Sequence, residues 1–330
     1  MTPIERVDAV LAGRKPDRPP FSFWYHFPHD QVAGTAAVRA HLDQLNRYAM
    51  DVLKVMNDNP YPHPGRIARV EDLASLVPLK GDEAGFGEQL AVLSALRTAI
   101  GGRVYMPTTV FNAWAVLRML IQRPTVHRPP NLDSSADAPS RWIRQAYREN
   151  SELVARALET IGQNLARFAA NCVAAGADGI FLSVRDDWVA EGEASADAPE
   201  TPGLYDRVVR PTDRAILAAV NESPFNVLHV CGKALNFRAF AEYPVPVLNW
   251  ADRAAGPSIR DVAPWAKPAL WGGVDNLATL VSGNPQQVRE EVVDALRQAE
   301  DRPIMIAPGC TFDPARVSEA NLHALADAVR

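Results

Sequence analysis

A histidine and a cysteine stand two positions apart in the segment NVLHVCGKAL, at the end of an apolar run. The chain has only seven histidines and three cysteines, so the pairing of His229 with Cys231 uses two scarce residue types. On a β-strand, side chains at positions i and i+2 point to the same face, with Cα atoms about 6.5–7 Å apart. If this run is a strand, the imidazole and the thiol converge on one point.

A second cysteine, Cys310, follows another apolar run in the segment IAPGCTF. One imidazole nitrogen and two thiolates suit Zn²⁺, and three protein ligands with one exchangeable position are typical of a catalytic zinc site. The alternative is that Cys231 and Cys310 are small buried hydrophobic residues and that His229 is a hydrogen-bonded core histidine. Two such residues at one strand end and a third at another favour the metal site.

The elements that position these residues alternate between short β-rich runs and longer segments of helical period. Eight runs are predicted to be strands: 20–25, 51–57, 104–110, 178–184, 225–230, 245–250, 269–274 and 303–307. Eight is the strand number of a closed (β/α)₈ barrel, in which parallel strands end at one common face. We therefore expect an α/β chain with a single TIM-barrel domain over residues 1–330, and the three ligands at its mouth.

Helical patterns with apolar residues three and four apart lie between these runs. They cover residues 39–50, 148–176, 211–222 and 284–301. The last begins with Asn284 followed by Pro285, an N-cap residue before a proline at the first helical position. Two segments rich in proline, serine and charge, 122–142 and 186–211, follow predicted strands, so we expect insertions at the rim of the barrel that serve as lids or rim loops.

Composition excludes several classes of function. The formal net charge of −5 and the absence of a dense basic run argue against nucleic-acid or acidic-membrane partners. No apolar signal segment and no membrane-length apolar stretch occur, so we expect a cytoplasmic protein. Three cysteines form no disulfide framework, and Cys172, on an apolar helical pattern, is expected in the core.

Three stretches of the chain resemble the uroporphyrinogen decarboxylase superfamily. They are ERVDAVLAGRKPDRPPFSFW near the start, AAGADGIFLS in the middle, and WGGVDN with PIMIAPGCTFDPARVSEANLHALADAVR near the end. The resemblance covers nearly the whole chain and implies a (β/α)₈ barrel, in agreement with the strand count.

The resemblance is closer to one branch of this superfamily than to the other. The porphyrin decarboxylases have an Arg-bearing RQAGR stretch after the first strand and a His after the last, whereas this chain has YHFPHD at 25–30 and Cys310. The other branch contains methyltransferases that pass a methyl group between a corrinoid protein and a thiol such as coenzyme M. Their zinc-binding signature, His-x-Cys with a distant Cys, matches His229, Cys231 and Cys310.

The resemblance also implies a fourth ligand, a cofactor and partners. Related zinc enzymes place a carboxylate a little over twenty residues after the first Cys, where this chain has Asp252, shorter than the Glu that is common there. The implied cofactor is Zn²⁺, and the implied partners are a small-molecule thiol, a methylated substrate or a separate corrinoid protein. The oligomeric state is open, and a homodimer is one alternative.

Six other residues are candidates for substrate binding. Five follow predicted strands and one lies in the second insertion: His26, Asp58, Asn112, Trp114, Asp187 and Tyr205. Asp58 also resembles the carboxylate that steadies pyrrole nitrogens in the decarboxylases. For each there is a structural alternative, such as a turn-forming Asp beside Pro60, a satisfied histidine, or a surface ion pair.

The sequence favours a zinc-dependent methyltransferase that activates a thiol. Two other functions stay open: uroporphyrinogen decarboxylation in porphyrin synthesis, and a non-catalytic ligand-binding barrel. An open coordination position distinguishes the enzyme from a structural metal site, which four protein ligands close.

Overall fold

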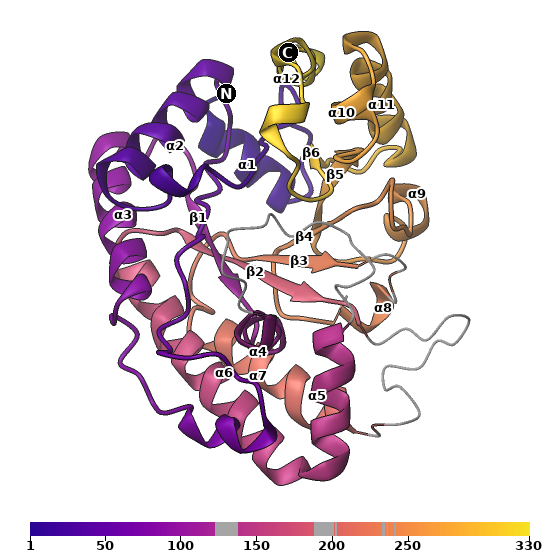
Figure 1. Cartoon of the computed structure of the whole chain (residues 1–330). Helices are drawn as coiled ribbons and strands as arrows, with labels where there is room; N and C mark the ends of the chain where they lie inside the picture. Colours follow the sequence, from indigo (N-terminus) through magenta and orange to yellow (C-terminus); the bar gives the residue numbers. More distant parts are fainter. Residues whose placement is uncertain (123–137, 188–200, 202, 233–234, 236, 241) are drawn as a thin grey trace.

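Six parallel strands form one sheet whose spatial order is the order of the chain. The computed structural model describes all residues except 123–137, 188–200, 202, 233–234, 236 and 241. The strands are β1 (Pro107–Phe111), β2 (Gly179–Arg185), β3 (Val227–Cys231), β4 (Val247–Trp250), β5 (Ala269–Val274) and β6 (Met305–Pro308). Because all neighbouring pairs are parallel, their carboxyl ends meet at one rim (Figure 1).

Two further segments, 20–25 and 51–57, close the barrel between β6 and β1. Ser22 N donates to Ile306 O at 3.1 Å, Asp51 N to Phe21 O at 3.0 Å, and Leu53 N to Tyr105 O at 2.9 Å. Both were predicted as strands, and the structure has only isolated parallel bridges there. The sheet therefore closes through backbone hydrogen bonds, as expected for a (β/α)₈ barrel.

The ladder in the first of these segments is broken by a change of register. Phe21 pairs with Ile306, but Tyr25 pairs with Phe312, so four residues on one side span six on the other. Such a mismatch interrupts continuous pairing, as a β-bulge does. This is why a run that has the composition of a strand forms separate bridges.

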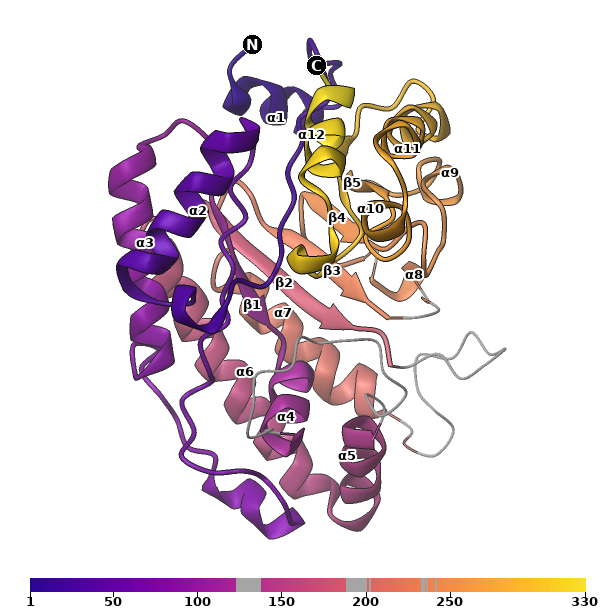
Figure 2. The same ribbon diagram turned by 45° about the horizontal axis from the view of Figure 1, so that its top comes forward.

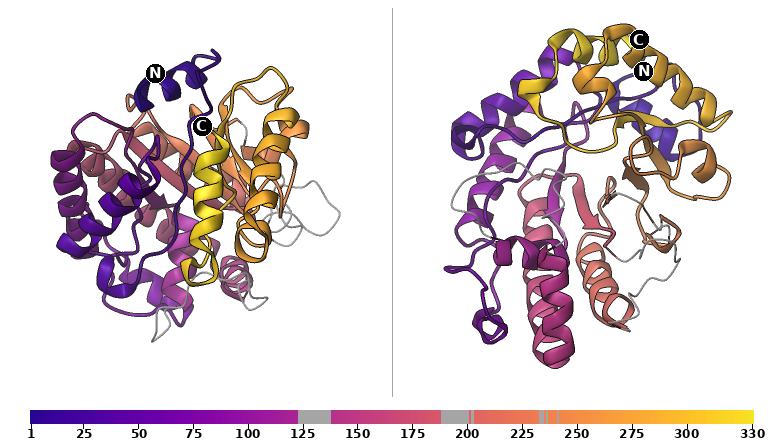
Figure 3. Two further views of the ribbon diagram at one scale, coloured as in Figure 1. Left: turned by 90° about the horizontal axis from the view of Figure 1, so that it is seen from above. Right: turned by 45° about the vertical axis from the view of Figure 1, so that its right-hand side comes forward.

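Helices surround the sheet on its outer side, as the turned views in Figure 2 and Figure 3 show. They are α1 (Pro3–Leu11), α2 (Gly34–Tyr48), α3 (Gly85–Ile100), α4 (Ala113–Gln122), α5 (Ala138–Glu149), α6 (Ser151–Ala174), α7 (Arg210–Ala218), α8 (Phe237–Phe240), α9 (Ile259–Val262), α10 (Thr279–Ser282), α11 (Pro285–Gln298) and α12 (Glu319–Ala328). Short turns are 3₁₀-helical at His29–Gln31, Val70–Ser75 and Pro314–Arg316, and π-helical at Tyr205–Val209. The long helix α6 packs on β1 and β2, and α11 packs on β5.

All four predicted helical patterns form helices, namely α2, α6, α7 and α11. The predicted cap of α11 is confirmed, since the Asn284 side chain accepts from the backbone amides of Gln286 and Gln287. Cys172 is fully buried on α6, as expected for a core residue. The two predicted rim insertions lie mostly outside the described residues. No helix in the described part of the chain is long and apolar enough to cross a membrane.

Side chains of β3 alternate between two apolar layers. Leu228 and Val230 belong to the core between the sheet and the helices, whereas Val227 belongs to a smaller cluster inside the barrel. His229 and Cys231 point into the barrel, as Val227 does, because alternate side chains of a strand point to the same face. The predicted convergence of these two side chains thus takes place inside the barrel.

Asp51 joins the amino-terminal segments to the barrel floor. Its buried carboxylate accepts from Arg18 at 2.7 and 3.0 Å, from Arg6 at 3.1 Å, and from the Phe21 amide at 3.0 Å. Its side chain is fully buried, so water cannot replace these bonds.

We predict that Asp51→Asn lowers the free energy of unfolding by about 3 kcal/mol, because both arginines lose their buried counter-charge. Chemical denaturation monitored by circular dichroism measures this loss. The matched control is Asp17→Asn, which removes a carboxylate from the same Arg6 but at a side chain that is 41% exposed. Its effect should be much smaller, and equal losses in the two variants would contradict the role given to Asp51.

Candidate metal centre

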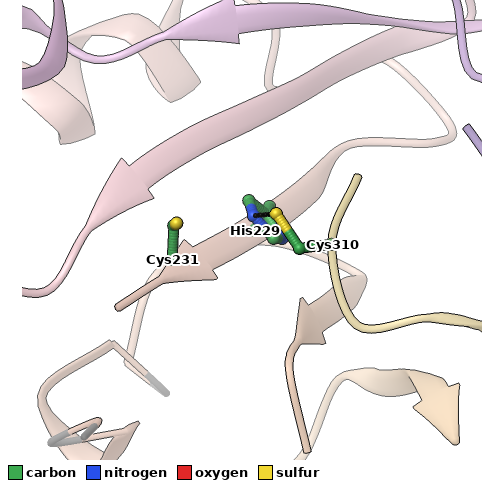
Figure 4. A group of neighbouring side chains, drawn as sticks. All are labelled: His229, Cys231 and Cys310. Atoms are coloured by element: carbon green, nitrogen blue, oxygen red, sulfur yellow. Dashed lines mark hydrogen bonds between the residues drawn. The ribbon is translucent and has the colours of Figure 1, made fainter. Parts of the chain in front are cut away.

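The structure brings together the three residues predicted to bind a metal. His229 and Cys231 lie on β3, and Cys310 lies two residues beyond the end of β6 (Figure 4). One ligand atom from each residue lies within 4.8 Å of the others. His229 is 4% exposed, whereas both cysteines are partly exposed. The group therefore opens toward the mouth of the barrel and is closed from within.

The spacing of two of these atoms suits a tetrahedral zinc ion. His229 Nε2 and Cys310 Sγ lie 3.5 Å apart. With Zn–N and Zn–S bonds of about 2.1 and 2.3 Å at a tetrahedral angle, the two donor atoms are expected about 3.6 Å apart. One imidazole and two thiolates form a donor set that zinc prefers. Within the described residues the group offers three donor atoms, so a tetrahedral ion held by them would have one further coordination position.

Asn249 sets the tautomer of His229. Its Oδ1 lies 2.6 Å from His229 Nδ1, and its amide nitrogen donates to Trp271 O at 2.7 Å. Because a carbonyl fixes the amide nitrogen, the oxygen must face the ring, and Nδ1 carries the hydrogen. Nε2 therefore presents its lone pair toward Cys310. The Phe181 ring, stacked on the imidazole at 5.2 Å, holds the ring plane.

Sequence reasoning did not find Asn249. A signal exists, because β4 pairs with β3 in parallel register and places Asn249 directly beside His229. A side-chain amide within an otherwise apolar strand is uncommon, and it indicates a hydrogen bond to another buried polar group. The register that makes them neighbours, however, depends on how the strands pair and is not visible in the local pattern.

The two thiols shift each other's pKa in opposite directions. A hydrogen bond from Cys231 lowers the pKa of Cys310 to about 7, against the opposing effect of burial. The same hydrogen bond, together with burial, raises the pKa of Cys231. One thiolate is thus available near neutral pH, and a bound divalent cation favours loss of the second proton.

Asp252, the candidate fourth ligand, is not among the grouped ligand atoms. Its Oδ1 accepts from the Gly273 amide at 2.9 Å, and its Oδ2 lies 3.5 Å from Arg253 Nε without a hydrogen bond. Burial raises the pKa of Asp252 to about 6. A buried carboxylate oxygen without a hydrogen-bond partner remains available for another interaction, so its role as a ligand stays a prediction.

His26 and Asp58 lie together at the barrel mouth. His26 Nδ1 and Asp58 Oδ1 are 2.5 Å apart, and both side chains are partly exposed. The Asp58 carboxylate favours the tautomer of His26 with hydrogen on Nδ1. The lone pair of His26 Nε2 is then free to accept a proton. His26 follows Tyr25, which bridges Phe312 two residues after Cys310, so the pair is on a segment adjacent to the metal centre.

The other four substrate candidates have partners within the protein. Trp114 Nε1 donates to Asp187 at 2.8 Å, and Ser140 and Arg185 also bond Asp187, each at 2.7 Å. Burial disfavours the charged carboxylate, but Arg185 and Arg118 outweigh this effect and lower the pKa of Asp187. These contacts hold Asp187 in place, and substrate binding by Trp114 or Asp187 stays a prediction.

A second internal network contains the remaining two candidates. Asn112 donates to Asp213 at 3.0 Å, Tyr243 donates to the other oxygen of Asp213 at 2.9 Å, and the Tyr205 and Tyr243 hydroxyls are 3.1 Å apart. All four side chains are buried. This series of hydrogen bonds connects Asn112, directly after β1, with Tyr205 in the π-helical turn. Substrate binding by Asn112 or Tyr205 stays a prediction.

A (β/α)₈ barrel with a His–Cys–Cys group at the carboxyl ends of its strands defines a class of barrel proteins suited to hold a metal with an open position. The model of the uroporphyrinogen decarboxylase (URO-D) family matches residues 2–330. The chain belongs to this family. A comparison with curated proteins finds no match.

Solved structures share the fold at low sequence identity. A methyltransferase from Methanosarcina mazei is 18% identical, with a TM-score of 0.74 over 99% of this chain and 98% of its own. A B12-independent methionine synthase from Shewanella sp. W3-18-1, in complex with selenomethionine, is 11% identical, with a TM-score of 0.51 over 94% and 92%. At these identities the likeness establishes the fold and leaves the reaction to the site.

We predict that Asn249→Ala lowers the zinc affinity of the protein by about 10- to 100-fold, because His229 loses the partner that fixes its tautomer. Competition with a chromogenic chelator measures the affinity. The control is Asn321→Ala on α12. It removes another buried side-chain amide, which donates to the backbone carbonyls of Leu280 and Gly283. Equal losses of affinity in both variants would indicate general destabilisation and contradict this role.

Proposed function

We propose that this protein is a zinc-dependent methyltransferase that activates a thiol acceptor for methyl transfer. The observation that carries the proposal is the His229, Cys231 and Cys310 group at the mouth, whose three donor atoms lie within 4.8 Å of one another, with His229 Nε2 and Cys310 Sγ 3.5 Å apart. A structural zinc site would need a fourth protein ligand in the same group, and the described residues supply none there.

His229, Cys231 and Cys310 would hold the zinc, and Asn249 would keep His229 Nε2 directed at it. When bound, zinc acts as a Lewis acid that favours the thiolate form of the acceptor and leaves a sulfur lone pair for attack. His26 Nε2 would receive the proton of the acceptor thiol, with Asp58 stabilising the charged ring. A sulfur–carbon bond forms as the methyl group leaves its donor.

The methyl donor would be a methylated small molecule or a methylcorrinoid carried by a separate protein. A thiol acceptor and a donor must approach from opposite sides of the transferred carbon, which requires an accessible mouth. Partial exposure of both cysteines agrees with such access. The methyltransferase and the methionine synthase that share the fold support a methyl-transfer reaction on this barrel.

The competing function is porphyrinogen decarboxylation, which the family name suggests. In the resemblance described above, that reaction uses an Arg-bearing stretch after the first strand and a His after the last. This chain has residues 25–30 (YHFPHD) and Cys310 at those places. A His–Cys–Cys donor group at the carboxyl ends of the strands favours thiol chemistry over decarboxylation.

We predict about one zinc per chain in the purified protein, and loss of the metal in His229→Ala, Cys231→Ala and Cys310→Ala. Metal content by mass spectrometry measures this. With methylcobalamin as donor and 2-mercaptoethanol as acceptor, the zinc protein should cleave the donor's cobalt–carbon bond, followed by absorbance, and removal of zinc by a chelator should stop the reaction. A metal-free wild type that decarboxylates uroporphyrinogen would sink the proposal.

We also predict that His26→Gln retains zinc but lowers the turnover number by about 10²–10⁴-fold, because the proton acceptor is lost. Asp58→Asn should give a smaller loss, since His26 remains. The control is His323→Gln, on the exposed side of α12, which should leave both zinc and turnover unchanged. Full turnover in the His26 variant would show that the thiol proton leaves by another route.

A further inference from the structure

A lysine lies inside the barrel, where lysines are rare. Lys54 is on the segment that closes the barrel beside β1, between Val52 and Met56, which both belong to the interior apolar cluster. The three residues share one side of an extended chain, so the Lys54 side chain also points inward. It is only 3% exposed. A fully buried lysine normally has a carboxylate partner.

The ammonium group of Lys54 has no such partner among the described residues. Its Nζ lies 2.8 Å from Met56 Sδ, a weak acceptor. It also lies 4.6 Å from the centroid of the Phe181 ring and 5.5 Å from that of Trp24. Cation–π contacts offset part of the cost of burying a charge, but far from all of it. Burial accordingly lowers the pKa of Lys54 to about 7.

The ammonium group of Lys54 lies close to the metal centre, with the Phe181 ring between them. Phe181, which contacts the ammonium, also stacks on His229. In the sheet register Ser183 pairs with His229, so Phe181 lies one inward-facing layer deeper. The ammonium therefore approaches the centre from within the barrel, on the side away from the mouth.

Three titratable groups act on Lys54 from neighbouring segments. Asp58 and Cys310 favour its charged form. His41 is neutral, because its Nε2 accepts from the Met56 amide at 3.0 Å and burial lowers its pKa to about 4. Asp58 has its own partner in His26. Besides Asp58, the negative group that acts on Lys54 is therefore Cys310, one of the three residues of the metal centre.

We propose that Lys54 is a positioning residue that makes the metal centre select an anionic fourth ligand, the thiolate of the acceptor. This inference rests on the proposed function. Zn²⁺ with two cysteine thiolates and a neutral histidine has no net charge, so an incoming thiolate makes the centre negative. A buried ammonium nearby offsets that charge in a medium of low dielectric constant. A neutral ligand gains nothing from it.

The test uses the protein loaded with Co²⁺ in place of zinc, because cobalt reports its ligands by visible absorbance. Two probes occupy the fourth position: 2-mercaptoethanol, which binds as a thiolate, and imidazole, which binds neutral. In Lys54→Met, which keeps side-chain length without charge, we expect the dissociation constant of 2-mercaptoethanol to rise about tenfold or more. That of imidazole should stay within about twofold, and cobalt content should not change. Lys54→Gln provides a second uncharged variant.

Thermal unfolding of the metal-free proteins adds a second readout. A lysine retained for structure alone should leave a less stable protein when replaced, whereas removal of a buried, unpaired charge should leave melting unchanged or raise it. Lys15→Met is the control for the same change of net charge, at an exposed site after α1. It should alter neither probe.

The outcomes separate the two proposals. Tenfold weaker thiolate binding with unchanged imidazole binding supports the role of Lys54. Equal thiolate affinity in wild type and both Lys54 variants, with cobalt bound, overturns that role and leaves the proposed metal function intact. A wild type that binds neither cobalt nor zinc overturns both.

Discussion

The hydrogen bond between Asn249 and His229 is the point at which the sheet determines the chemistry of the site. A histidine can bind a metal through either nitrogen, and only a partner on one nitrogen decides which lone pair is free. Here the partner is Asn249, which lies beside His229 on the neighbouring strand β4. Its side-chain nitrogen donates to the Trp271 carbonyl on β5. Three adjacent strands therefore set the direction of a single lone pair. Any slip in their pairing would turn His229 away from Cys310.

The barrel interior combines groups that are individually unfavourable to bury. His229, with Cys231 and Cys310 beside it, and Lys54 contact Phe181 of the small apolar cluster or lie close to it. The much larger apolar core between the sheet and the helices supplies the stability that tolerates them. Such a division is expected in barrel enzymes, where the outer layer holds the fold and the carboxyl ends of the strands carry function.

Much of this arrangement could be predicted from the sequence, and the exceptions have physical causes. Alternation on β3 and the position of Cys310 after β6 were sufficient to predict that His229, Cys231 and Cys310 meet, because both depend on local pattern and a common sheet direction. Asn249 and Lys54 were missed because their roles depend on which strands are neighbours and which side of the closing segment faces inward. Two predicted strands proved to be isolated bridges, since composition does not reveal a change of register such as that between Phe21 and Tyr25.

Cys310 comes from the chain beyond the last strand, whereas His229 and Cys231 lie on the third, with β4 and β5 between them in the sheet. A growing polypeptide on the ribosome cannot bring these three donors together until Cys310 has been made, after all six strands. A metal held by this group would therefore bind late, after the strands of the sheet have been made.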